Sequence, residues 1–393
     1  MRITGRLCET GQYSVVTVAD GRITSIQPQD KGQNGAVELG ASDVWIAPGF
    51  IDTQFNGYGG YNFNHGSWSR GDVSDVAISR IVELAARAGT PMLCPTIFTG
   101  HNQGMMESLR STARAVDKDR DLARALPAIH VEGPYISSEE GARGAHPPEH
   151  IRDPDWEEFQ RFQEAANGLI KILTLAPERR GGLAFIEKAT EAGIVISIGH
   201  TAATPEQIRD AAQAGARMST HLGNGSHAMI PRHQNYIWEQ LADDRITAGI
   251  ITDGHHLPPS VAKCFARVKG PGRLVIVSDA VALGGCPAGI YDDGRHEVLP
   301  SGKVVLAGTP YLAGAGHLLD TCVANALRFT DLGLDGVARA TATNPARLLG
   351  LGDRKGRVAA GYDADLTLFR VPPDEGPLGI VATIAEGKTV FRA

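Results

Sequence analysis

Two histidines, His200 and His221, stand in matched positions along the chain. Each follows a run typical of a buried strand, 194–198 before the first and 217–220 before the second, and a helix-like segment, 205–214, separates the runs. Neighbouring parallel strands joined by a crossover helix end on the same side of a sheet, so both imidazoles are expected at one edge, where they could bind one metal ion. A single buried histidine is more often a hydrogen-bonded core residue. The matched pair favours the metal site.

Two carboxylates end other predicted strands. Glu132 closes the third strand and Asp279 closes the eighth. Glu132, His200 and His221 would supply three metal ligands and leave a fourth position for water, which a metal makes more acidic. Asp279 stays outside this ligand set and is the natural base; taken alone, it could equally be a helix N-cap or a structural hydrogen-bond partner. The pattern as a whole predicts metal-assisted hydrolysis.

The elements that must position these side chains are apolar runs alternating with helical segments from Val44 onward, the pattern of a parallel sheet. Eight runs are predicted strands, at 44–55, 92–98, 128–132, 170–176, 194–200, 218–222, 246–252 and 274–279. Eight such units predict an α/β fold of the (β/α)8 or TIM-type barrel class, in which active sites lie at the carboxyl ends of the strands. Polar residues stand at those ends, and burying them is unfavourable unless they serve a ligand.

Both ends of the chain differ from this pattern. Short β-branched runs near the start predict a small antiparallel sheet, which two runs near the end are expected to join, at 2–7, 14–18, 22–26, 366–369 and 388–391. The glycine-rich stretch 281–310 contains one predicted hairpin, 297–299 with 303–306. Its role is not indicated by the sequence.

The composition excludes several classes of function. The 393 residues include 42% hydrophobic and 21% charged side chains with a net charge of −6 and both signs dispersed, so no basic surface predicts nucleic-acid binding. The apolar runs fall far short of the roughly 18 residues of a membrane span, and no apolar leader follows Met1. The five cysteines are odd in number without paired spacing. We expect a cytoplasmic protein with reduced thiols and no nucleic-acid or membrane partner.

Six short motifs follow one another between Val44 and Asp279. They are Pro48-Gly49-Phe50-Ile51-Asp52, His130-Val131-Glu132-Gly133-Pro134, Gly199-His200-Thr201, Thr220-His221-Leu222-Gly223-Asn224, Asp253-Gly254-His255-His256 and Ser278-Asp279-Ala280. This ordered set resembles the motifs of the N-acetylglucosamine-6-phosphate deacetylase family within the amidohydrolase superfamily. The segment 356–366 is similar to the closing segment of that superfamily. Each motif alone is weakly specific, whereas their order is strongly so.

The resemblance implies a (β/α)8 barrel with a small β-sandwich built from both termini. The expected boundaries are 1–47 and 351–393 for the two parts of the small domain and 48–350 for the barrel. The implied reaction is hydrolysis of a sugar acetamide to the amine and acetate, with the metal on Glu132, His200 and His221 and Asp279 as the catalytic acid and base. His130 is expected beside the site and not among the ligands.

The resemblance also implies how the substrate is bound. His146 matches a histidine that helps to polarise the acetamide carbonyl. Gly223, Asn224 and His256 are placed at the sugar-phosphate pocket, and Arg232 matches an arginine that reaches the phosphate of the neighbouring subunit, so an amino-sugar phosphate substrate and a homodimer are expected. The chain departs from the usual family wording after Asn224, through 225–238.

A second departure concerns the metal count. Many amidohydrolases carry His-x-His after the first strand, where this chain has Gln54-Phe55-Asn56. Because a carboxamide is a poor transition-metal ligand, the expected cofactor is one divalent metal ion per chain, Zn²⁺ in particular. The alternatives are an amidohydrolase for another N-acyl sugar or an N-acyl amino acid, and a non-catalytic barrel that serves as a scaffold. Retention of the ligand set together with Asp279 argues against the scaffold.

Overall fold

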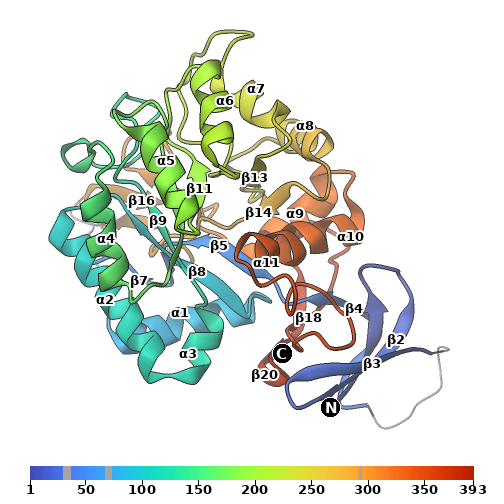
Figure 1. Ribbon diagram of the computed structural model, residues 1–393. Helices are drawn as coiled ribbons and strands as arrows, with labels where there is room; N and C mark the ends of the chain where they lie inside the picture. The colour runs from blue at the N-terminus through green and yellow to red at the C-terminus, as the bar shows by residue number, and fades with distance from the viewer. Residues whose placement is uncertain (30–36, 67–72, 292–293) are drawn as a thin grey trace.

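The computed structural model describes residues 1–29, 37–66, 73–291 and 294–393. Figure 1 shows a ring of strands surrounded by helices, with a smaller sheet beside it that contains both chain ends. Eight parallel strands form the ring in the order β14-β13-β12-β11-β10-β9-β8-β5. Their bounds are β5 Ile51–Phe55, β8 Met92–Phe98, β9 Ile129–Glu132, β10 Ile170–Leu175, β11 Val195–Ile198, β12 Met218–Ser219, β13 Thr247–Ile250 and β14 Leu274–Ile276.

The ring closes between its first and last strands. The Asp279 backbone N–H donates to the Gln54 carbonyl at 3.0 Å, and the Asn56 N–H donates to the Ala280 carbonyl at 2.8 Å. A parallel bridge also joins Phe55 to Ala280. Closure removes the unpaired strand edges that an open sheet would present, and it sets the residue that follows β14 beside those that end β5.

Helices cover the outside of the barrel (Figure 1). They are α1 Asp75–Arg87, α2 Asn102–Lys118, α3 Arg120–Ala125, α4 Trp156–Ala165, α5 Gly182–Glu191, α6 Pro205–Ala214, α7 Tyr236–Ala242, α8 Pro259–Lys269, α9 Leu319–Phe329, α10 Gly333–Ala338 and α11 Asn344–Leu348, with a 3-10 turn at Pro148–His150 and a π-helical turn at Arg339–Thr343. Apolar residues at helical spacing explain the packing of the longer helices, as in α1, which buries Ile78, Ile81 and Ala85 on one face.

Helix α6 shows how local sequence positions the site. Thr204 caps its first turn in a capping box with Gln207, Pro205 takes the first helical position, and Gly215 ends the helix at a φ of 122°. The helix buries Ile208 with two alanines against the barrel. These signals fix the length of the crossover between β11 and β12, so the two strands are parallel neighbours in register.

The small sheet has seven strands in the order β20-β19-β18-β4-β1-β2-β3. Their bounds are β1 Arg2–Leu7, β2 Tyr13–Ala19, β3 Arg22–Pro28, β4 Leu39–Pro48, β18 Leu366–Arg370, β19 Gly379–Ala385 and β20 Lys388–Arg392. The pair β1 with β4 is parallel and the other pairs are antiparallel. The predicted fold class, a (β/α)8 barrel with a small β domain from both termini, is confirmed.

The predicted strand 44–55 is wrong in one respect, because two strands occupy it. Strand β4 ends at Pro48 in the small sheet and β5 begins at Ile51 in the barrel. Gly49 lies between them, and a Cβ at this position would come within 2.5 Å of Pro91. The chain therefore passes from one sheet to the other at a contact too tight for a side chain, while the apolar pattern continues because both strands are buried.

The stretch after β14 forms a three-stranded antiparallel sheet, β15 Gly289–Tyr291, β16 His296–Val298 and β17 Val304–Leu306, so the predicted hairpin at 297–306 is confirmed. A two-stranded ribbon, β6 Gly57–Tyr58 with β7 Tyr61–Asn62, follows β5. The described residues contain no helix that is long and apolar enough to cross a membrane.

Candidate active site

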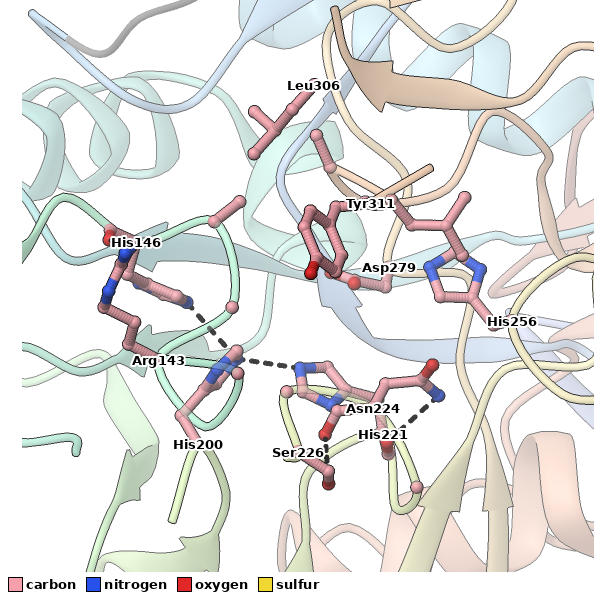
Figure 2. A pocket seen from close by; sticks show the side chains of 18 of the residues that line it. Arg143, His146, His200, His221, Asn224, Ser226, His256, Asp279, Leu306 and Tyr311 are labelled. Carbon is pink, nitrogen blue, oxygen red and sulfur yellow. Dashed lines mark hydrogen bonds between the residues drawn. The ribbon is translucent and has the colours of Figure 1, made fainter. Parts of the chain in front are cut away.

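Three predicted metal ligands converge at the carboxyl ends of adjacent strands. Glu132 ends β9, His200 follows β11, and His221 follows β12, all three buried. The Glu132 Oε1 lies 3.2 Å from His200 Nε2 and 3.0 Å from His221 Nε2. The two histidine Nε2 atoms face each other at 3.0 Å (Figure 2). Their donor atoms all lie within 4.8 Å of one another. A carboxylate oxygen and two imidazole nitrogens facing one point are a suitable donor set for a Zn²⁺-type ion.

The surroundings of His200 fix which nitrogen faces this point. Its Nδ1 lies 3.0 Å from the Ala142 carbonyl, so Nδ1 carries the proton and the Nε2 lone pair is left to coordinate. Two glycines make room for the ring: a Cβ on Gly144 would come within 3.0 Å of it, and one on Gly225 within 2.5 Å. The imidazole therefore has little freedom to turn away.

Strained backbone marks the same residues. His200, His221 and Asp279 adopt φ values of 49°, 26° and 53°, in the left-handed region that non-glycine residues rarely occupy. The other described non-glycine residues with positive φ are Asp20, Asn167 and Glu386. Strain of this kind persists where the surrounding structure enforces it, and it concentrates at functional sites. Here it turns three side chains inward directly after their strands end.

Asp279 stands beside the ligand group and is held by two carboxamides. Gln54 Nε2 donates to Glu132 Oε1 at 2.9 Å and to Asp279 Oδ1 at 3.1 Å, and Asn56 Nδ2 donates to the same Oδ1 at 2.8 Å. Burial, followed by the charge of Glu132, raises the pKa of Asp279 to about 6. Both carboxamides point their N–H groups at carboxylates, whereas their oxygens, Gln54 Oε1 and Asn56 Oδ1, are buried without a hydrogen-bond partner.

His146 lies against the ligand group. Its Nε2 is 3.2 Å from His200 Nε2, and its ring meets Phe98 edge-on with centroids 6.3 Å apart. Burial and then the proximity of His200 lower the pKa of His146 to about 3, so it is a neutral imidazole that can donate one hydrogen bond. Figure 2 shows His146 directed at the same centre as His200 and His221.

A cavity of about 820 Å³ opens over this group, and its lining includes the predicted residues Gly223, Asn224 and His256. Asn224 Nδ2 donates to the His221 carbonyl at 3.3 Å. His256 Nδ1 lies 2.9 Å from Asp253 Oδ2. Although burial alone would raise the pKa of Asp253, hydrogen bonds from His256 and its neighbour hold that pKa below its usual value. Asp253 thereby orients the His256 ring.

The structure does not bring Arg232 into the cavity of this chain. Arg232 is exposed and is not among the residues that line the cavity. Its backbone carbonyl accepts a hydrogen bond from Trp238 Nε1 at 3.1 Å. Among the described lining residues, Arg143 is the one lysine or arginine present. Its Nη1 lies 3.5 Å from the His146 carbonyl. An Arg232 contact with substrate would therefore have to come from another copy of the chain.

His130 lies inside the barrel below the ligand group. Its Nδ1 is 2.9 Å from the Thr53 carbonyl and its Nε2 is 2.7 Å from Thr174 Oγ1, so both ring nitrogens are used within the core. The Thr174 hydroxyl in turn forms a hydrogen bond with the Thr220 hydroxyl, with 2.6 Å between their Oγ1 atoms. This hydrogen-bonded chain fills the barrel beneath the metal site and satisfies polar groups that are remote from water.

Comparison with known proteins identifies the class to which this fold and site belong. A model of the amidohydrolase family matches residues 45–390. The chain belongs to that family and, within it, to the N-acetylglucosamine-6-phosphate deacetylases. It is 31% identical to the Bacillus subtilis enzyme of that name over 379 residues, covering 96% of this chain and 92% of the relative. The human enzyme of that name is 32% identical over 359 residues, covering 88% and 84%.

Solved structures agree with this membership. The crystal structure of N-acetyl-D-glucosamine-6-phosphate deacetylase from Mycobacterium smegmatis superposes with a TM-score of 0.88 at 30% identity, covering 100% of both chains. An aspartate-to-alanine variant of that enzyme, in complex with N-acetyl-D-glucosamine-6-phosphate, gives a TM-score of 0.87 at 29% identity over 99% of each chain. The resemblance found in the sequence motifs is confirmed over nearly the whole chain.

Proposed function

We propose that this chain hydrolyses the acetamide of N-acetylglucosamine 6-phosphate to glucosamine 6-phosphate and acetate. The observation that carries the proposal is the buried group of Glu132, His200 and His221, whose donor atoms face one point with Asp279 alongside. It is supported by the family membership and by the sugar phosphate bound to the related Mycobacterium smegmatis variant. A scaffold protein would have no use for two imidazole nitrogens buried against a carboxylate.

The residues present fit one divalent metal ion, and Zn²⁺ suits the nitrogen and oxygen donors best. Such an ion, when bound, polarises the amide carbonyl and makes water more acidic. Glu132, His200 and His221 would hold it. Gln54 and Asn56 offer only carboxamide oxygens beside the two carboxylates that accept their N–H groups, and a carboxamide is a poor transition-metal ligand, which supports a site for one ion and not two.

Asp279 would move the proton that amide hydrolysis requires. Its Oδ1 accepts both carboxamide hydrogen bonds, so Oδ2 is the oxygen left to take a proton from the attacking water and return it to the departing nitrogen. His146 would donate a hydrogen bond to the carbonyl oxygen as negative charge develops there. Gly223, Asn224 and His256 line the same cavity and would contact the sugar.

We propose that a second copy of the chain takes part in recognition of the phosphate. Arg232 lies outside its own cavity, so we propose a homodimer in which it reaches the phosphate in the neighbouring site. Arg232→Ala should lower kcat/KM for the 6-phosphate sugar by about 30-fold or more and leave any activity on N-acetylglucosamine unchanged, because a charge-assisted contact is lost only where a phosphate exists.

The matched control for Arg232 is Arg180→Ala. The Arg180 side chain is 90% exposed and forms an ion pair with Asp153 away from the cavity. Its removal should leave kcat/KM unchanged for both substrates. Equal losses on both substrates in the Arg232 variant would give Arg232 a structural role and would remove the support for a phosphate site shared between subunits.

The test of the proposed function is a substrate comparison on purified protein of known metal content. We expect turnover of N-acetylglucosamine 6-phosphate with one equivalent of metal per chain, weak turnover of N-acetylglucosamine, and none of N-acetyl amino acids. A preference for the unphosphorylated sugar or for an N-acyl amino acid would replace the proposed substrate. Two metal equivalents in the active protein would contradict the single-ion site.

A further inference from the structure

Tyr311 is an aromatic residue on the wall of the catalytic cavity. It lines that cavity and is 60% exposed, although large apolar side chains in this protein are mostly buried. Figure 2 shows the Tyr311 ring projecting into the cavity, with its hydroxyl end directed towards Asp279 and the metal-site histidines. An exposed aromatic ring on the wall of a ligand cavity is a feature that marks binding sites.

The turn that carries Tyr311 is held by its own backbone. The Leu306 N–H donates to the Tyr311 carbonyl at 2.9 Å, and the Tyr311 N–H donates to Thr309 Oγ1 at 3.2 Å. Thr309 Oγ1 in turn donates to the Leu306 carbonyl at 2.8 Å. Leu312 forms an antiparallel bridge with Val305 directly after the turn. The Tyr311 ring is therefore presented from a defined hairpin and needs little ordering when a ligand binds.

The same hairpin is attached to the segment that carries Asp279. The Ala315 N–H donates to the Asp279 carbonyl at 2.9 Å, and the Val281 N–H donates to the Ala315 carbonyl at 3.1 Å. Between them Gly314 packs so closely that a Cβ there would come within 2.1 Å of Val281. The position of the aromatic ring is thus tied by backbone hydrogen bonds to the position of the catalytic carboxylate.

We propose that Tyr311 is a substrate-contact residue whose ring packs against the pyranose ring of the acetylated amino sugar. The proposal rests on the proposed function. If the acetamide lies at the metal ligands with its nitrogen beside Asp279, the sugar ring that carries this nitrogen lies under the hairpin. One face of a pyranose presents C–H bonds, and these pack favourably on the electron-rich face of an aromatic ring. The contact is with the sugar ring and not with the phosphate.

The test is a set of variants assayed on two sugars. Tyr311→Ala should raise KM for N-acetylglucosamine 6-phosphate about tenfold with kcat changed less than threefold, the effect of losing one aromatic contact made equally in the ground and transition states. Tyr311→Phe keeps the ring and should recover most of that loss. Ile290→Ala is the control, because Ile290 lies in β15 of the neighbouring three-stranded sheet, is 69% exposed and does not line the cavity.

Binding to the Asp279→Asn protein separates the two proposals. Calorimetry should show that Tyr311→Ala weakens the binding of N-acetylglucosamine and of its 6-phosphate by the same factor. Arg232→Ala should weaken the binding of the phosphorylated sugar only. An effect confined to the 6-phosphate, a Phe variant as weak as the Ala variant, or unchanged binding would each overturn the ring contact. If the Asp279→Asn protein binds neither sugar, the proposed function itself has failed.

Discussion

Two buried clusters of acidic side chains in this protein are neutralised in different ways. At the barrel rim, Glu132 and Asp279 receive hydrogen bonds from the uncharged carboxamides of Gln54 and Asn56. Where the tail meets the small sheet, the ammonium group of Lys355 lies between three carboxylates, 2.7 Å from Asp365, 3.0 Å from Asp363 and 3.2 Å from Glu386. Both clusters are largely buried, and of the two only the second is built around a lysine.

The difference shows what each cluster can still bind. Lys355 and Asp365 are each 6% exposed, and Arg354 adds a second cation 2.7 Å from Asp363. The carboxylates of that cluster are paired with cations of the same chain, and removing one partner leaves buried charge behind. At the rim, Glu132 faces two imidazole nitrogens and Asp279 accepts from two carboxamides, so none of these partners carries a permanent positive charge. The rim is built to accept a cation from outside, whereas the other cluster is built to hold the fold.

Removing a rim ligand should have the largest effect on activity. Glu132→Ala should release the metal, because a three-ligand site loses much of its affinity with one ligand gone, and turnover should fall by at least about three orders of magnitude. Metal analysis after gel filtration measures the first effect. The control Glu206→Ala removes an exposed carboxylate on α6 and should keep both metal and activity. A Glu132→Ala protein that retains its metal would contradict the assigned ligand set.

Asp279→Asn should have the next largest effect while leaving the metal in place. The substitution keeps the shape but removes the base, so kcat should fall by about two to four orders of magnitude. Because burial and the neighbouring Glu132 disfavour the charged form of Asp279, the variant should be at least as stable as the natural protein. Near-native turnover would refute Asp279 as the base, and loss of metal would place it among the ligands.

The sequence allowed the carboxyl ends of the strands to be located, because apolar runs of barrel length end visibly at polar residues. Glu132, His200, His221 and Asp279 were found in this way, and the structure brings all of them together. The roles of Gln54 and Asn56 as donors to Asp279 were not predictable, since they depend on closure between β5 and β14, which no local pattern encodes. Their position after the first strand was the available signal.

Two other features could not be predicted from the sequence, for physical reasons. The junction at Gly49 was missed because the apolar pattern is the same on both sides of it, and the tight contact is made by Pro91, which is distant in the chain. Tyr311 stands in a glycine-rich stretch without periodicity, so its place over the cavity follows only from the hydrogen bonds that attach Ala315 to Asp279. Such long-range contacts decide positions that local propensity leaves open.

The Lys355 cluster should respond to mutation in stability and not in chemistry. Lys355→Met leaves three carboxylates without their central partner and should lower the free energy of unfolding by about 3–5 kcal/mol. Urea unfolding measures this, and kcat of the folded protein should be unchanged. Lys118→Met is the matched control: its side chain is 60% exposed and lies 2.8 Å from Asp75, so its loss should alter the free energy by less than about 1 kcal/mol.

The smallest expected effect is the pH dependence of the stability that the Lys355 cluster contributes. Although burial would raise the pKa of Asp363, Lys355 and Arg354 lower it below the usual 3.8. A carboxylate with a lowered pKa stabilises the fold above its unfolded pKa, and this contribution is lost as pH falls towards its folded pKa. Lys355 has a raised pKa, so its own contribution is retained below its usual pKa of 10.5 and is not affected by acid.

Acidification should therefore remove part of the advantage that the natural protein has over Lys355→Met. Between pH 6 and pH 3 the difference between their midpoints of thermal unfolding should narrow by about 1–3 °C, while the difference between the natural protein and Lys118→Met stays near zero. The comparison should be made on metal-free samples, so that protonation of the rim histidines affects every protein alike. A difference that widens on acidification would mean that Lys355 does not stabilise the ionised form of Asp363.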